Sequence, residues 1–167
     1  MKEDMHGRLI EAMMDLYRGD AKRIQHFLKV WGFAKTIGEL EGLGEQTQFI
    51  LETAAIVHDI GIHTCEEKYG NCAGKLQEIE GAPLAEKLLT QLGYEQEVVD
   101  RVSWLVGHHH TYADVTDIDH QILLEADFLV NSFEDAMEPE QVRRFCEAVF
   151  RTKAGTRLLN LQWGERS

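Results

Sequence analysis

The sequence is short of the residues that interrupt helices. Only two of its 167 residues are proline, Pro83 and Pro139. No segment alternates apolar and polar side chains in the way that half-buried β-strands do. Hydrophobic residues make up 44% of the chain and charged residues 28%, a balance that supports a folded core and excludes a disordered chain. These absences predict a helical protein.

Positive charge is scarce too. Lys and Arg number 17 against 29 Asp and Glu, so the formal net charge is −12 at pH 7. This excess of acid argues against a nucleic-acid backbone or an anionic membrane surface as the main partner, because both attract clustered cations. A small phosphorylated ligand stays compatible with it, since a few local cations or a metal ion reverse the field inside one cleft.

Long apolar runs and paired cysteines are missing as well. No run approaches the roughly 18 apolar residues of a membrane span, and the first residues have no secretory leader pattern. The three cysteines, Cys65, Cys72 and Cys146, show no C-x-x-C spacing. An odd number of such thiols indicates a reducing compartment, so we expect a cytoplasmic protein.

Apolar residues at helical spacing, separated by glycines, indicate an all-α fold. We expect a single domain over residues 1–167, a helical bundle of about seven or eight helices with its core at about 20–135 and C-terminal helices at 139–165 packed on that core. Pro83 is expected in the first turn of its helix, where a missing N–H costs little, and Gly61 at a helix end. The expected helices cover about 3–18, 21–42, 45–59, 83–93, 95–110, 117–133 and one or two within 138–163, with 63–81 irregular or short-helical.

Five metal-capable side chains fall on apolar helix faces or directly beside them. An isolated ionised Asp in an apolar core is very costly, so several such groups on separate helices indicate a cation between them. Imidazole and carboxylate together suit Mn, Fe, Co, Ni or Zn. The residues that share this placement are His26, His58, Asp59, His109 and Asp127.

Each of these residues alone has a plainer interpretation. A single His on an apolar helix face is more often a hydrogen-bonded core residue than a ligand, and a single Asp can cap a helix or pair with Arg. The run His108–His110 can be a polar helix end, because adjacent residues cannot all point at one metal. The joint occurrence in the order His, His-Asp, His, Asp favours a metal site.

The ordered set of His26, the pair His58-Asp59, and Asp127 within LLEADFLVN resembles the HD-domain superfamily of metal-dependent phosphohydrolases. The likeness covers most of the chain. It implies that these four residues bind one divalent metal. The 18 residues from His109 to Asp127 resemble the spacing in YqeK-like diadenosine tetraphosphate hydrolases.

Two departures from that family concern the substrate and a second metal. Many relatives read HDxGK, and this chain has Ile62 in place of the lysine. Relatives with two metals usually carry a His before the helix that holds Pro83, where this chain has Glu80. By resemblance, a second metal would therefore use Glu80, His108 and His109.

The expected reaction is hydrolysis of a small phosphorylated metabolite by a water that the metal activates. The family resemblance makes a nucleotide the expected substrate and leaves monoester, diester and anhydride open. Asp59 is expected to orient the water, and His108 or His109 to protonate the leaving group.

Three cations are candidates for binding substrate phosphates. Arg23 lies three residues before His26 and so on a neighbouring face of that helix. Lys68 and Lys75 lie in the glycine-rich segment after the His-Asp pair. Each of the three is equally well explained as a solvated surface cation.

Two other functions stay open from the sequence. Some HD-fold relatives are di-iron oxygenases, and a second iron would need Glu80, His108 and His109 together. A non-catalytic signalling domain is the third reading, although a degenerate module would be expected to lose some ligands. A homodimer is compatible with all three.

Overall fold

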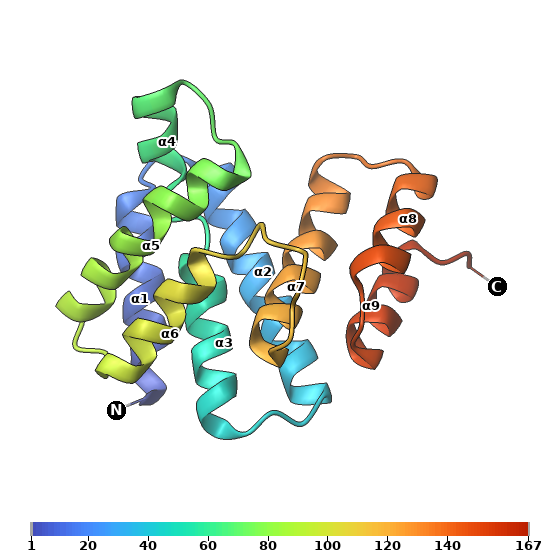
Figure 1. The fold of residues 1–167 in the computed structure, drawn as a ribbon, viewed down its shortest axis with the longest axis horizontal. Coiled ribbons are helices and arrows are strands. Elements are labelled where there is room, and N and C mark those ends of the chain that lie inside the picture. Colours follow the sequence, from blue (N-terminus) through green and yellow to red (C-terminus); the bar gives the residue numbers. More distant parts are fainter. Residues whose placement is uncertain (1, 167) are drawn as a thin grey trace.

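Nine α-helices and no β-strand make up residues 2–166, the part of the chain that the computed structural model describes (Figure 1). The predicted all-α class is confirmed. The helix count exceeds the prediction because the segment after the His-Asp pair forms a helix of its own. The helices are α1 (Lys2–Leu16), α2 (Ala21–Leu40), α3 (Glu45–Val57), α4 (Ile62–Tyr69), α5 (Gly74–Gln91), α6 (Gln96–Val106), α7 (Ile118–Glu134), α8 (Pro139–Val149) and α9 (Lys153–Trp163).

Helix α3 is the centre of the fold. It contacts α1, α2, α6 and α7, and every residue over 49–57 is buried. The sequence explains this position, because the second half of α3 is apolar or small on almost every side and such a helix must be covered all round. His58 follows this buried stretch at once, so the His-Asp pair starts its turn inside the protein.

The remaining helices are arranged around α3. α2 and α7 lie side by side, and both contact α3. α8 and α9 sit at one end of the molecule, where α9 contacts α7 and α2 (Figure 1). None of the helices within residues 2–166 combines the length and the hydrophobicity that crossing a lipid bilayer requires.

Pro83 lies inside α5 rather than in its first turn, which corrects the prediction from the sequence. The helix starts at Gly74. A proline in a helix interior cannot donate to the carbonyl four residues earlier, here that of Ile79. The Ile79 side chain is 57% exposed. This side of α5 therefore faces solvent, where water can replace the missing N–H.

The structural role of Gly61 also differs from the predicted one, which was to end a helix. Its backbone angles (φ −81°, ψ −4°) are right-handed, so it is not a left-handed residue that ends a helix. α3 ends at Val57 instead, and Gly61 precedes α4. A Cβ at Gly61 would lie 2.7 Å from the backbone nitrogen of Gly81 on α5. The glycine is therefore needed for the close approach of two backbones.

Candidate metal centre

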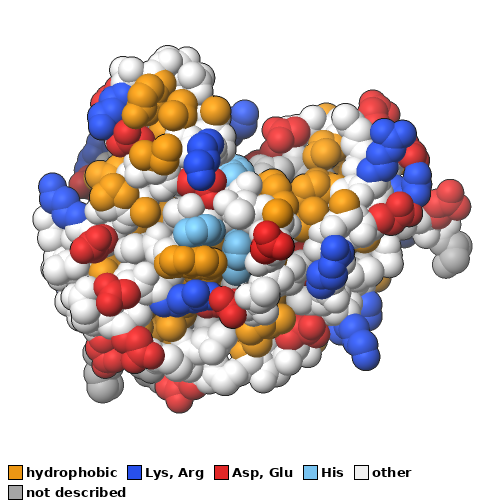
Figure 2. Space-filling view, viewed as in Figure 1, with side chains coloured by type: hydrophobic (Ala, Val, Ile, Leu, Met, Phe, Trp, Pro, Cys, Tyr) orange, Lys and Arg blue, Asp and Glu red, His pale blue; other side chains and the backbone are white. Residues whose placement is uncertain are grey.

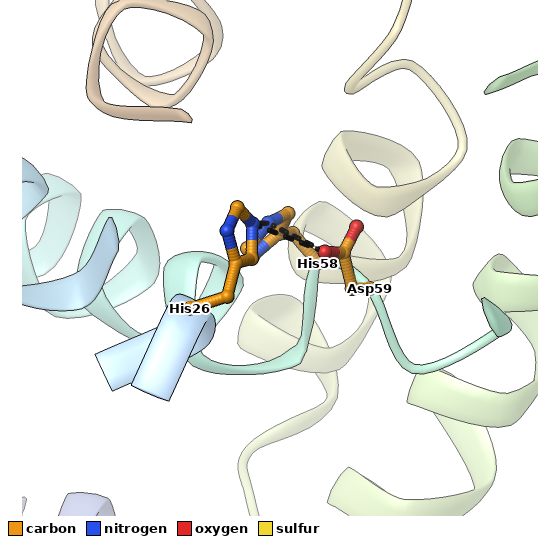
Figure 3. Close-up of side chains that lie close together, drawn as sticks. All are labelled: His26, His58 and Asp59. Carbon is orange, nitrogen blue, oxygen red and sulfur yellow. Dashed lines mark hydrogen bonds and ion pairs between the residues drawn. The ribbon is translucent and has the colours of Figure 1, made fainter. Parts of the chain in front are cut away.

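Four ligand-type side chains meet in the middle of the bundle, and we call them the central cluster. They are His26 from α2, His58 and Asp59 from the turn after α3, and Asp127 from α7. Nε2 of His26 lies 3.2 Å from Nε2 of His58 and 3.2 Å from Oδ2 of Asp59 (Figure 3). Oδ1 of Asp127 lies 3.2 Å from Nε2 of His26 and 3.3 Å from that of His58. Atoms bound to one ion at about 2.0–2.2 Å lie about 3–3.5 Å apart, so the cluster has the spacing of a ligand shell.

Packing explains why these side chains meet. Because α2 and α7 flank the end of α3, one inward residue from each helix reaches the turn that holds the His-Asp pair. The Tyr17 hydroxyl donates a hydrogen bond to the backbone carbonyl of Asp59 and fixes that turn. The His58 side chain is fully buried, and the other three are 6–13% exposed. The cluster is thus shielded from water except on one side.

Hydrogen bonds set the direction in which the imidazoles offer their lone pairs. Nδ1 of His26 lies 2.6 Å from Oε1 of Glu134, whose other oxygen, Oε2, accepts a hydrogen bond from Lys29. Nδ1 of His58 and Nδ1 of His109 lie 2.7 and 2.6 Å from backbone carbonyls three residues earlier. A ring that donates from Nδ1 keeps Nε2 unprotonated, which is the usual arrangement of a metal-binding histidine. Glu134 was not predicted, although it lies seven residues after Asp127 on the same face of α7.

Two buried acceptor atoms at the site lack a hydrogen-bond donor within residues 2–166. Oδ1 of Asp127 and Nε2 of His109 have no hydrogen-bond partner among the described residues. Oδ1 lies beside the Nε2 atoms of His26 and His58, which have no proton to donate when both rings are neutral, as metal-binding imidazoles are. A buried polar atom without a partner costs about 1–3 kcal/mol, so both atoms fit a metal ion better than an apolar interior.

The pKa values of the four residues in the central cluster also show that a positive charge is favoured there. Burial alone would lower the pKa of His26 and His58, but the carboxylates of Asp127 and Asp59 outweigh it and raise the pKa to about 11 and about 10. In turn, the pKa values of both Asp residues are held well below their ordinary range by these histidines despite the opposing effect of burial. Without an ion, the cluster would therefore hold protons in its place.

A second group of ligand-type atoms adjoins the first and shares Asp59. It consists of Asp59, His109 and His110, whose ligand atoms lie within 4.8 Å of one another. Oδ1 of Asp59 lies 3.4 Å from Nε2 of His109. Nε2 of His110 lies 3.1 Å from Oε1 of Gln77. Burial, with His109 beside it, lowers the pKa of His110 to about 4, so this ring is neutral.

His110 and Gln77 were not predicted as site residues. A Cβ at Gly74 would lie 2.8 Å from Cγ of His110, so the start of α5 leaves room for that ring only because residue 74 is glycine. Nothing in the helical periodicity marks this contact, since it joins two segments that are 36 residues apart.

The comparison with known families settles the fold family. Residues 23–144 match the model of the HD domain, and this range contains the whole central cluster. The chain belongs to the HD-domain family. Two solved structures share the fold: an HD-superfamily hydrolase from Bacillus thuringiensis (TM-score 0.64, 18% identity, 97% of this chain and 90% of that chain) and YpgQ from Bacillus subtilis (TM-score 0.64, 17% identity, 96% and 89%). No curated protein matches the sequence.

In this HD domain, two residues predicted for a second metal lie elsewhere. The His108 ring stacks on Trp104 with 3.9 Å between centroids, and its Nδ1 lies 2.7 Å from the Trp104 carbonyl. Consecutive residues at a helix end point in different directions, so His108 turns outward where His109 turns inward. Glu80 accepts hydrogen bonds from Lys68 and Tyr69 at 3.0 and 2.7 Å. Neither His108 nor Glu80 belongs to the two groups found among the described residues.

A pocket of about 250 Å³ opens onto the central cluster. The space-filling view shows a hollow between the end of the molecule that contains α4 and the end that contains α8, with histidine side chains near its base (Figure 2). The residues that line the pocket are Lys22, Arg23, His26, Asp59, Ile62, Cys72, Gln77, His110, Asp127, Asn131, Glu134 and Asp135.

Only one of the three predicted phosphate-binding cations lines this pocket. It is Arg23, and Lys22 next to it was not predicted. Lys68 points to Glu80 instead, and the Lys75 side chain is 78% exposed near Glu78. The lysines of the α4–α5 segment therefore behave as surface cations.

Proposed function

We propose that this HD domain is a divalent-metal-dependent phosphohydrolase that acts on a small phosphorylated metabolite. The observation that carries the proposal is a pair of buried acceptor atoms without donors, Oδ1 of Asp127 and Nε2 of His109. Both belong to the site whose Asp59 carboxylate lines the pocket. A cation at the central cluster supplies what Oδ1 of Asp127 lacks, and the attacking water or a second cation supplies what Nε2 of His109 lacks. A cation beside Lys and Arg side chains in one pocket suits a phosphate substrate.

The central cluster is the metal site in this proposal. Its two imidazole nitrogens and two carboxylate oxygens suit Mn, Fe, Co, Ni or Zn. When bound, such an ion lowers the pKa of a water and polarises a phosphoryl oxygen. Asp59 is suited to orient the attacking water, because one of its oxygens faces the cluster and the other faces His109.

His109 is the group that we expect to move the proton. Its Nδ1–H is committed to a backbone carbonyl, so Nε2 can accept a proton from the attacking water. Nε2–H can then donate to the leaving oxygen, which is the role predicted from the sequence. Asp59 lies 3.4 Å from this nitrogen and would stabilise the imidazolium in between.

A second metal would have a different ligand set from the one predicted. Asp59, His109 and His110 offer three ligand atoms, in place of Glu80 and His108. If that site fills, His109 becomes a ligand and the proton must pass through water. The stoichiometry of bound metal separates these two versions of the proposal.

Pocket size and charge define the substrate class. A volume of about 250 Å³ is below the usual range for a whole drug-sized ligand, so it suits a phosphate group and the atoms next to it, with the remainder outside. The net charge of −12 agrees with a small ligand rather than a nucleic acid. A nucleotide stays the substrate that the family likeness suggests.

The positions of Glu80 and His108 weaken the oxygenase alternative. A second iron was expected to need both, yet one is bonded to Lys68 and Tyr69 and the other is stacked on Trp104. The complete central cluster also weakens the reading as a non-catalytic module.

The proposal is tested with metal-stripped protein that is reconstituted with Mn, Co, Fe or Zn. Phosphate release is then assayed with nitrophenyl phosphate, nucleotides and dinucleotide polyphosphates as substrates. We expect turnover that appears only with metal. A filled metal site with no phosphate release from any of these substrates, or two irons with oxygen consumption, would contradict it.

Two neighbouring histidines provide a matched pair of variants for the same assay. His109→Gln should lower turnover by about 100-fold, because general acid–base groups contribute about 10²–10⁴-fold. His108→Gln should leave it nearly unchanged, since that ring contacts Trp104. Equal losses in both variants would remove His109 from the mechanism.

A further inference from the structure

Arg23 lies at the edge of the pocket between two carboxylates. Its guanidinium donates to Oε1 of Glu66 on α4 and lies 3.4 Å from Oδ2 of Asp20, the residue that caps α2. The Arg23 side chain is 27% exposed. It also lies one helical turn before His26, so a ligand at the metal site would be within its reach.

The two carboxylates differ in how freely they can release Arg23. Asp20 also accepts from the backbone N–H of Arg23 at 3.3 Å and lies 2.7 Å from Nε2 of His63, so its position is fixed. Arg23 is the one hydrogen-bond and ion-pair partner of the Glu66 carboxylate among the described residues, and the Glu66 side chain is 40% exposed. An ion pair that is partly open to solvent contributes little, and a phosphate dianion offers a guanidinium more charge and two oxygens.

No other wall of the pocket supplies a cation. Ile62 lines it where many relatives have lysine, and Cys72 and Gln77 continue this uncharged side. Lys22 is exposed, lines the pocket and makes no ion pair with any described residue. Both of the Lys and Arg side chains that line this pocket therefore come from the first turn of α2.

We propose that Arg23, assisted by Lys22, binds the phosphate of the substrate, and that Glu66 competes with the substrate for Arg23. The proposal rests on the proposed function and deepens it: α2 takes over the role of the missing lysine at position 62, and α4 carries a carboxylate that occupies the phosphate site when no ligand is there. Oδ1 of Asp127, buried without a donor and lining the same pocket, marks the side on which the metal would meet that phosphate.

Titration calorimetry of inorganic phosphate into the full-length, metal-loaded protein tests this competition. Arg23→Gln should weaken phosphate binding by about tenfold or more, as expected for a lost charge-assisted contact. Glu66→Gln should tighten it by about two- to fivefold, as expected for the loss of a competing ion pair that is partly open to solvent. Lys75→Gln, outside the pocket, is the matched charge control and should change nothing.

The double variant Arg23→Gln/Glu66→Gln separates competition from a general change in charge. We expect its affinity to equal that of Arg23→Gln alone, because Glu66 acts only through Arg23. Three results would overturn the proposal. The wild-type protein binds no phosphate, or Arg23→Gln binds phosphate as tightly as Lys75→Gln, or the tighter binding caused by Glu66→Gln persists in the double variant. Metal-dependent turnover, measured separately, reports on the hydrolase proposal itself, so the two can fail independently.

Discussion

Helix α7 carries two buried carboxylates two residues apart, and their surroundings differ completely. Glu125 is fully buried and accepts hydrogen bonds from Gln121, from the backbone N–H groups of Arg151 and Thr152, and from the Thr152 hydroxyl. One oxygen of Asp127 has no hydrogen-bond partner within residues 2–166. Burial of an acid is therefore not in itself the sign of a functional site; the sign is burial among acceptors.

The difference follows from which helices face each residue. Glu125 faces the start of α9, where a helix has free N–H groups that a carboxylate satisfies. A Cβ at Gly155 would lie 1.9 Å from its Oε1, so a glycine at that position lets α9 come this close. Asp127 faces α2 and the turn after α3, which offer imidazole nitrogens instead. The Glu125 carboxylate joins α7 to the start of α9, whereas Asp127 keeps an oxygen that no donor among the described residues satisfies.

The largest effect is expected from Asp127→Ala. Loss of this ligand should abolish metal retention and lower metal-dependent turnover by about 10²–10³-fold or more, because the catalytic charge is no longer held. Elemental analysis of the purified variant and the phosphate-release assay check both parts. Full metal content with full activity would show that Asp127 is not a ligand.

Glu125→Ala should have the opposite profile. It leaves several buried N–H and O–H donors without an acceptor, so we expect the free energy of unfolding to fall by about 3 kcal/mol. Urea unfolding of the metal-free protein measures this. Metal stoichiometry should be unchanged, and a loss of metal in this variant would mean that the two carboxylates are not independent.

Addition of metal offers a third comparison between the two carboxylates. An ion present at about 100 times its dissociation constant stabilises the folded state by about 2.7 kcal/mol. A thermal shift should therefore appear in the wild-type protein and in Glu125→Gln, and should be absent in Asp127→Ala. A shift in all three proteins would indicate that the ion binds away from the central cluster.

The smallest effect is expected at Glu134, which orients His26. Glu134→Gln keeps an acceptor for Nδ1 but loses the charge, so metal affinity should fall by about tenfold, the lower end for residues that support a ligand. Competition with a metal-sensitive dye measures it. Glu147→Gln, exposed on α8, is the control, and equal affinities in the two variants would assign no orienting role to Glu134.

The sequence was sufficient for the fold class and for the four residues of the central cluster. Helical periodicity marks inward faces, and His26, His58 and Asp127 lie on such faces, so their meeting could be foreseen although their ligand role stays a prediction. Periodicity also marked His109 as an inward residue. The family resemblance added His108 for a second metal, and the stacking of that ring on Trp104 could not be foreseen from the sequence. His110 and Gln77 meet across a contact between the start of α5 and the turn after α6, and local sequence contains no signal for such pairing.

The contact between Gly61 and Gly81 has a consequence for how this site tolerates change. A methyl group at position 61 would press on the α5 backbone at Gly81 and, at 3.1 Å, on the carbonyl of Gln77. Gln77 lies 3.1 Å from Nε2 of His110, so one added carbon at a position with no chemistry of its own would press on the backbone that carries a neighbour of the second ligand group. The position of Gln77, and with it the hydrogen bond to His110, therefore depends on the absence of a side chain at residue 61.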